Sequence, residues 1–144
     1  MSRSTITSQS VFRGPPRGFS MVELFVVMAV IAILSAIAYP SYLSYKVRAN
    51  RAASQAVLMD LANREQQYFL DVRGYSADLS ALGYGTIPTE VSPFYTIDAP
   101  TVDNAATPPT YFVTASPRSG TMQANDGQLK VTSAGAKTRG TLSW

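Results

Sequence analysis

The sequence predicts an α+β protein in which one long N-terminal helix packs on a small antiparallel β-sheet. An almost uncharged apolar segment covers residues 19–39, and a segment with helical spacing of its apolar residues continues to residue 72. Short segments rich in aromatic and β-branched residues then follow one another, separated by links that contain proline or glycine. A helix followed by a run of strands is the element order of α+β folds.

Residues 1–18 form a basic leader with Arg3, Arg13 and Arg17 and no acidic residue. Positive charge beside an apolar span favours the cytoplasmic side of a membrane. The chain has 12 Lys and Arg residues, so nine remain after the leader, and these balance the nine Asp and Glu residues. The basic character of the chain therefore belongs mostly to the leader and gives little reason to expect a nucleic acid partner.

The apolar segment from Phe19 to Tyr39 is long enough to cross a bilayer. As a helix it would measure about 30 Å, which is the thickness of the hydrocarbon core. A secretory signal instead has a shorter apolar core followed by a small-residue cleavage site, and residues 36–38 could imitate such a site. The long leader and the carboxylate of Glu23 argue against that interpretation.

Glu23 is the most informative residue of this segment. An ionised carboxylate costs about 2.5 to 3.5 kcal/mol at the centre of a bilayer and less near its edge, so a plain anchor has no reason to contain one. If the chain is cleaved after Gly18, the new amine of Phe19 lies about one helical turn from Glu23, in the same helix or in a neighbouring one. Cleavage would therefore create the countercharge.

The junction Gly18-Phe19-Ser20-Met21-Val22-Glu23 resembles the processing site of type IV prepilins, with Gly before the cut and Glu at the fifth mature position. The resemblance implies that a prepilin peptidase cleaves between Gly18 and Phe19 and methylates the new amine. It also implies the type IV pilin fold. The alternative is a signal-anchored envelope protein in which Glu23 is accidental.

Residues 19–40 are expected to form the transmembrane and filament-core helix. Pro40 lacks an amide donor, so it should kink or locally loosen the helix; it either permits melting during assembly or only bends the helix. Tyr39, Tyr42 and Tyr45 follow, where amphipathic rings suit the membrane interface.

Residues 41–144 are expected to form a periplasmic head. Its helix should face a sheet with one apolar stripe, consisting of Ala53, Val57, Leu61, Tyr68 and Val72. Nearby charged residues are expected mostly in solvent or between subunits, namely Arg48, Arg51, Asp60, Arg64 and Glu65. Gly74 is a candidate helix C-cap.

The rest of the head divides into a connecting loop (74–93), an antiparallel sheet (94–132) and a C-terminal tail (133–144). The expected strands are Phe94–Ile97, Tyr111–Ala115 and Leu129–Thr132. The helix from Ser41 to Phe69 and the last strand with its Trp-ended tail resemble PilE-type minor pilins of Gram-negative type IVa pili. Such subunits usually tie the tail with a disulfide, but this chain has no cysteine. Trp144 and Leu142 are therefore expected to pack back on the sheet.

The absence of Cys and His leaves no expected metal site, cofactor or catalytic group, and Ser119 and Ser133 have no base, so enzymatic activity is not expected. A type II secretion pseudopilin is one alternative. Pseudopilins often carry acidic calcium ligands in the C-terminal loop, whereas the only acid after Asn104 is Asp126.

The resemblance implies a minor pilin that primes or joins a type IV pilus in adhesion, twitching motility or DNA uptake. Its implied partners are other pilins, the prepilin peptidase, the assembly machinery and, before assembly, the inner-membrane bilayer; afterwards it lies in the surface pilus. A DNA-binding competence pilin is an alternative, with a basic patch of Arg118, Lys130, Lys137 and Arg139 and with Tyr95 and Tyr111 as stacking rings. Such a patch is more often a solvated face.

Overall fold

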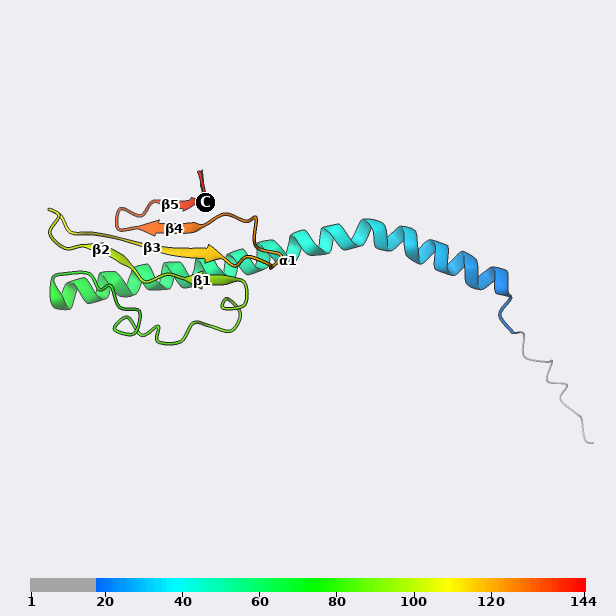
Figure 1. Ribbon diagram of the computed structural model, residues 1–144, viewed down its shortest axis with the longest axis horizontal. Coiled ribbons are helices and arrows are strands. Elements are labelled where there is room, and N and C mark those ends of the chain that lie inside the picture. The colour runs from blue at the N-terminus through cyan, green and yellow to red at the C-terminus, as the bar shows by residue number, and fades with distance from the viewer. Residues whose placement is uncertain (1–17) are drawn as a thin grey trace, which may run out of the picture. The chain divides into compact units, whose positions relative to one another are not determined.

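The computed structural model describes residues 18–144, so the leader arginines Arg3, Arg13 and Arg17 lie outside the described residues. The chain divides into two compact units between Ala38 and Tyr39. One helix and six strands are present in the described part of the chain, namely α1 (Met21–Val72), β1 (Tyr95–Ile97), β2 (Thr101–Asp103), β3 (Thr110–Pro117), β4 (Leu129–Thr132), β5 (Lys137–Arg139) and β6 (Leu142–Ser143) (Figure 1). The predicted long helix and antiparallel sheet are confirmed.

The sheet is antiparallel throughout and has the order β1-β3-β4-β5-β6, with β2 also paired to β3. The strand expected at 129–132 is confirmed with its bounds. Two expectations were wrong. β2 lies in what was expected to be a link, and β5 and β6 extend the sheet into the expected tail. These three strands have two or three residues each and little apolar alternation, so the pattern that reveals a half-buried strand is absent.

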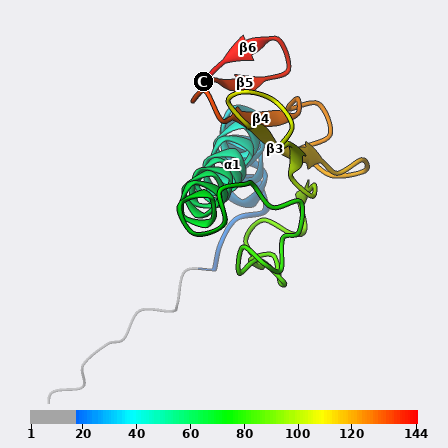
Figure 2. The same cartoon turned by 90° about the vertical axis from the view of Figure 1, so that its left-hand side faces the viewer.

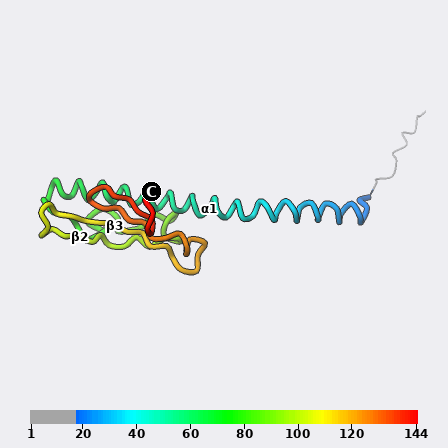
Figure 3. The backbone as a smooth tube through the Cα atoms, turned by 90° about the horizontal axis from the view of Figure 1, so that it is seen from above, coloured from blue at the N-terminus to red at the C-terminus, as the bar shows by residue number. Residues whose placement is uncertain are grey.

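The core of the head lies between the sheet and α1. Figure 2 shows the strands gathered on one side of the helix, and in Figure 3 they run beside its green part. The helix contributes Val57, Leu58 and Leu61, which are almost completely buried. The sheet contributes the inner residues of three strands, which are Tyr95, Ile97, Tyr111, Val113, Ala115, Leu129 and Val131.

Glu65 and Val72 contradict the expected helix pattern. Val72 is 57 % exposed, although it was assigned to the apolar stripe. Glu65 was expected in solvent or between subunits, but it is fully buried. One of its oxygens accepts the Ser76 amide at 3.0 Å, and the other has no hydrogen-bond partner among the described residues. Burial raises the pKa of Glu65. The connecting loop therefore covers a position that helical spacing alone places at the surface.

The C-terminus of α1 also differs from the prediction. Arg73, not Gly74, adopts the left-handed conformation, with φ of 62°. The side chain of Asn104 pairs with the backbone of Tyr75 on both sides, accepting its N–H at 2.8 Å and donating to its carbonyl at 3.0 Å. A Cβ on Gly74 would lie 3.4 Å from Asn104. Gly74 thus leaves room for this contact and does not cap the helix.

The C-terminal segment is held partly as expected. Trp144 is half-buried against the core, and its indole N–H donates to the carbonyl of Thr138 at 2.9 Å. Leu142 was expected to pack beside it but is 58 % exposed. The tail is therefore fixed by the indole and by main-chain pairing of β5 with β4.

Candidate functional site

The N-terminal segment presents apolar side chains on all sides. Residues 19–38 are exposed along their whole length, including Phe19 at 80 %. Among the described residues, α1 is the one helix long and apolar enough to cross a membrane. Glu23 lies in its first turn and is the single charged side chain between residues 19 and 45. A surface of this kind requires burial outside the described chain, in lipid or among other helices.

The expected processing junction precedes the helix. Residues 18–20 have no regular structure, and α1 begins at Met21. A Cβ added to Gly18 would meet nothing within 4 Å. The fold of the described chain therefore does not require glycine at this position. A requirement for Gly18 would come from a processing enzyme.

Pro40 lies inside α1, and the helix is continuous across it. Pro40 therefore does not interrupt α1 in this structure, and its role during assembly stays a prediction. The boundary between the two compact units lies two residues before Pro40. The tyrosines Tyr39, Tyr42 and Tyr45 that flank it are exposed by more than half of their surface.

A buried polar network around Asp126 was not foreseen. Asp126 lies in the link between β3 and β4, and its carboxylate is almost fully buried. It accepts two hydrogen bonds from Nε of Arg51 on α1, at 2.8 and 2.9 Å, and pairs with the terminal nitrogen of the same guanidinium. Arg139 on β5 completes the ion cluster at 3.3 Å. One carboxylate thus joins the helix, the link and the C-terminal hairpin.

Two neutral groups complete this network. The hydroxyl of Tyr95 donates to Asp126, and the amide of Gln123 lies 2.8 Å from the carboxylate. Gln123 also donates to the carbonyl of Val47 on α1 at 3.0 Å. Burial alone would raise the pKa of Asp126, but the hydrogen bonds from Arg51, Tyr95 and Gln123 lower it to about 2. The carboxylate is therefore charged at neutral pH and fully committed to the fold.

The four cations proposed for DNA do not share one face. Residues paired directly across strands lie on the same side of a sheet. Lys137 and Arg139 are paired with Val131 and Leu129, whose side chains are buried in the core, so both lie on the helix side. Lys130 lies on the opposite side, and its ammonium stands 3.8 Å from the centre of the Phe112 ring.

Arg139 and Lys137 already contact other side chains within the head. The guanidinium of Arg139 belongs to the Asp126 cluster, while the ammonium of Lys137 lies 5.6 Å from the centre of the Trp144 ring. Arg118 is exposed in the link after β3. Lys130, Lys137 and Arg118 therefore remain as separate positive positions and do not form one continuous patch.

The expectation that Tyr95 and Tyr111 could stack on DNA bases was wrong. Both are buried, Tyr95 completely, with their hydroxyls bonded inside the head. Tyr111 donates to the carbonyl of Ala62 on α1 at 3.1 Å. Alternation of aromatic residues on a strand does not reveal which side faces the helix. The aromatic rings that do meet these cations are Phe112 and Trp144.

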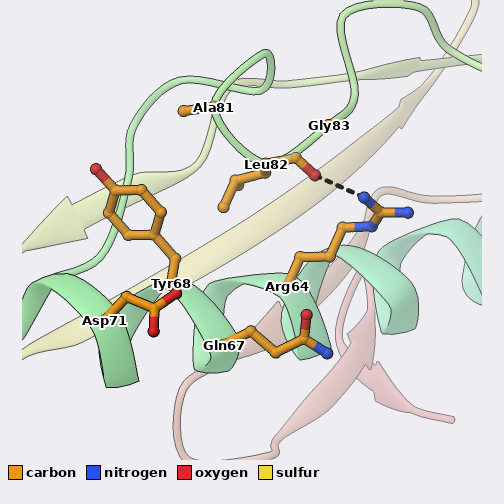
Figure 4. Close-up of a pocket in the computed structure, with 7 residues that line it drawn as sticks. All are labelled: Arg64, Gln67, Tyr68, Asp71, Ala81, Leu82 and Gly83. Atoms are coloured by element: carbon orange, nitrogen blue, oxygen red, sulfur yellow. Dashed lines mark hydrogen bonds between the residues drawn. The ribbon is translucent and has the colours of Figure 1, made fainter.

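An open groove of about 320 Å³ lies between α1 and the connecting loop (Figure 4). Arg64 in this groove donates hydrogen bonds to the carboxylate of Asp60 at 2.8 Å and to the carbonyl of Leu82 at 3.0 Å. The groove is lined by Arg64, Gln67, Tyr68, Asp71, Ala81, Leu82 and Gly83. A Cβ on Gly83 would lie 2.5 Å from Arg64, so the glycine permits the loop to close over the arginine. These contacts fasten the connecting loop.

Comparison with known proteins identifies two families. A family described as "Type IV minor pilin ComP, DNA uptake sequence receptor" matches residues 40–130, more than half of the chain. A second, described as "Prokaryotic N-terminal methylation motif", matches residues 15–39.

Individual relatives match over about half of this chain. The chain is 34 % identical to "Type IV wide pilus major component PilA4" of Thermus thermophilus, over 53 % of this chain and 60 % of the relative. It is 31 % identical to "Type IV major pilin protein PilA" of Myxococcus xanthus, over 52 % and 34 %. It is 28 % identical to "Type IV major pilin protein PilE1" of Neisseria gonorrhoeae, over 55 % and 48 %. The chain therefore spans about half the length of the curated relatives that it matches.

Proposed function

The chain belongs to the type IV minor pilin family, and we propose that it is a structural subunit that is processed at its N-terminus and joins a pilus through its apolar helix. The observation that carries this proposal is the pairing of a methylation motif over residues 15–39 with an apolar helical segment that has no partner among the described residues. Before assembly the subunit crosses the inner membrane once, with residues 41–144 in the periplasm.

Processing is proposed at the bond between Gly18 and Phe19. The lack of regular structure at residues 18–20 supports access of a prepilin peptidase to this bond. Cleavage would remove the basic leader and leave an amine on Phe19, which the same enzyme would methylate. The assembly machinery then moves the apolar segment from lipid into a bundle of like helices.

Glu23 is proposed to set the position of each subunit in that bundle. Its carboxylate would pair with the amine of Phe19 on an adjoining subunit, because in a dry core an ionised group requires an opposite charge. Apolar side chains alone permit many registers between neighbouring helices. One buried ion pair distinguishes among them. Pro40 is proposed to let the helix melt locally as the subunits pack.

The first test is the intact mass of the protein from cells with and without prepilin peptidase. A mass that corresponds to residues 19–144 plus one methyl group is expected, and only when the peptidase is present. A full-length chain, or one cleaved after residues 36–38, would instead indicate an anchored or secreted envelope protein.

The second test separates processing from assembly. Glu23→Ala should be cleaved normally but recovered in sheared pili at a small fraction of the wild-type amount. Glu90→Ala is the matched control, because Glu90 is an exposed glutamate of the connecting loop. Normal incorporation of the Glu23 variant would remove Glu23 from the assembly mechanism while leaving the processing result intact.

DNA binding is a second candidate function, favoured by the description of the matching family as a DNA uptake sequence receptor. Lys130 and Lys137 each lie beside an aromatic ring, on opposite sides of the sheet, and each pair can hold a phosphate near a stacking surface. Arg118 is a further exposed cation, whereas Arg139 would first have to leave Asp126.

This candidate is tested with full-length protein in detergent and duplex DNA at several salt concentrations. Replacing Lys130 and Lys137 with Gln should weaken binding and reduce the salt slope by about one for each phosphate that the variant no longer neutralises. Replacing Lys46 and Arg48 with Gln changes the net charge equally and serves as the control. An equal effect of the two pairs would indicate a response to net charge and no defined DNA surface.

A further inference from the structure

The distribution of charge beyond the apolar segment has a feature that the pilus role does not explain. No acidic residue lies between Glu23 and Asp60, but Lys46, Arg48 and Arg51 do. Cations are usually concentrated on the cytoplasmic side of a span, so their position just after it runs against the common pattern. Arg51 is committed to Asp126. Lys46 and Arg48 are exposed.

These two cations lie close to the end of the apolar segment. At 1.5 Å per residue, Lys46 and Arg48 are about 10 and 14 Å along the helix from Tyr39. Two exposed tyrosines fill the interval, and the ammonium of Lys46 lies 5.8 Å from the centre of the Tyr42 ring. Tyrosine rings followed by cations at this distance match the interface between hydrocarbon and water.

The link between β3 and β4 adds a third cation at the same end of the head. Gln123 binds the carbonyl of Val47 at 3.0 Å, which holds the link against α1. The hydroxyl of Thr121 donates to the carbonyl of Arg118 at 2.8 Å and fixes the turn that carries this exposed arginine. In Figure 1 this link, in orange, reaches α1 at the end of the sheet where β3 finishes. We call Lys46, Arg48 and Arg118 the basic collar.

We propose that the basic collar binds phosphates of anionic lipid headgroups in the bilayer that holds the apolar segment. This inference rests on the proposed membrane-anchored state of the subunit. Headgroups extend several ångströms beyond the hydrocarbon, and charges interact over a Debye length of about 8 Å at physiological salt. The collar therefore lies within reach of lipid phosphates. Each cation is expected to favour the membrane-bound head by about fivefold.

Lipid is favoured over DNA as the occupant because of position. The exposed tyrosines beside the collar are residues that suit the membrane interface. The proposed DNA cations instead lie beside Phe112 and Trp144 in the head. The head of a waiting subunit would then stay at the surface of an anionic bilayer. Extraction into the filament would break these contacts.

The test uses the full-length chain in vesicles, which is simple to label because the sequence has no cysteine. Ser119→Cys places one fluorophore beside Arg118 on an exposed residue. Its quenching by a nitroxide on lipid headgroups is compared in phosphatidylcholine alone and in phosphatidylcholine with phosphatidylglycerol. Quenching should be several-fold stronger with the anionic lipid and should fall to the neutral level at high salt.

Two matched charge pairs test the assignment. Lys46→Gln with Arg48→Gln should lower the affinity of the head for the anionic surface by about 25-fold, from two factors of five, and Arg118→Gln by about fivefold. Lys130→Gln with Lys137→Gln removes the same charge from the sheet and should change it little. Equal losses for the two pairs would overturn the proposal.

A second label tests membrane insertion of the apolar segment separately from lipid binding by the collar. Ser35→Cys lies inside the apolar segment, and its quenching by an acyl-chain nitroxide reports insertion regardless of lipid charge. Insertion without any effect of anionic lipid at Ser119 would overturn the collar proposal alone. No insertion would overturn the membrane-anchored state as well. Loss of duplex DNA binding in the collar pair, without lipid dependence, would assign the collar to DNA instead.

Discussion

Two stretches of the same helix face opposite situations. Leu34, in the N-terminal unit, is 61 % exposed, whereas Leu58, in the head, is completely buried. The N-terminal stretch is apolar on every side and has no partner among the described residues, while the head stretch buries one side against its own sheet. The first stretch is thus built to be covered by another molecule or by lipid, and the second to be covered by its own chain.

The comparison also separates two sources of stability. Burial of the head stretch contributes to the unfolding free energy of the isolated protein. The apolar surface of the N-terminal stretch contributes only after insertion or assembly, because apolar area stabilises a state only when that state removes it from water. Substitutions in the two stretches should therefore be detected by different measurements.

The largest expected effect comes from the same substitution made in both stretches. Leu58→Ala should lower the unfolding free energy of the head by about 3 kcal/mol, since it removes buried methyl groups and leaves a cavity. Leu34→Ala should leave that value within about 0.5 kcal/mol. Denaturant unfolding of the full-length chain in mild detergent, followed by near-ultraviolet circular dichroism, provides both values. A similar loss in the two variants would mean that the N-terminal stretch also supports the head.

Asp126→Ala tests whether the head is held together by more than apolar packing. It removes the shared acceptor of Arg51, Arg139 and Tyr95, and breaking a buried ion pair of this kind costs about 3 kcal/mol. Glu90→Ala, at an exposed carboxylate of the connecting loop, is the control and should change stability little. Thermal unfolding of the two variants compares them. If both unfolded like the wild type, the network would be incidental to stability.

The same residue predicts a dependence on pH. The pKa of Asp126 is about 2 in the folded head and about 3.8 when unfolded, so its contribution is fully present above the unfolded value. It is lost as the pH falls from about 4 toward 2, by about 2 kcal/mol. Asp126→Asn should show a flatter acid limb in unfolding free energy against pH. Glu65 acts in the opposite sense, since its raised pKa gives stability at low pH that is lost as the pH rises.

Trp144→Ala should have a smaller effect, confined to the C-terminal hairpin. The variant removes a half-buried indole from the core together with its hydrogen bond to Thr138, for about 1.5 kcal/mol. Leu142→Ala should cost less than about 0.5 kcal/mol because Leu142 is mostly exposed. Hydrogen exchange of the amides of β5 would locate the change. An equal cost for the two variants would show that Leu142 packs against the head after all.

The N-terminal features were predictable because they need no tertiary information. The apolar length, the carboxylate of Glu23 and the glycine before Phe19 are local properties, and the family match over residues 15–39 agrees with them. The burial of Glu65 depends on a loop that begins beyond the end of α1. The role of Asp126 depends on two arginines 75 and 13 residues away. Neither follows from the spacing of residues within one element.

The sheet shows the same limit. The strand at 129–132 was predicted from its β-branched residues, and in the structure Leu129 and Val131 form its buried side. β5 carries only polar residues, and its pairing becomes evident only when Arg139 meets Leu129 across the ladder. For the same reason the four cations looked like one patch in sequence, but Lys130 lies on one side of the sheet, Lys137 and Arg139 lie on the other, and Arg118 lies in a link.

Arg73→Gly has the smallest expected effect and increases stability. Arg73 adopts a left-handed conformation at the end of α1, which costs a non-glycine residue about 1 kcal/mol and costs glycine little. The gain should be about 0.5 to 1 kcal/mol, since glycine also makes the unfolded chain more flexible. Arg73→Ala removes the same side-chain charge but keeps the Cβ, so it should show no gain. A gain in both variants would assign the effect to the charge of Arg73 and not to its backbone. Because this strain lies in the head, the amount of pilin recovered in pili should stay unchanged, which keeps head stability and assembly through the apolar helix separate.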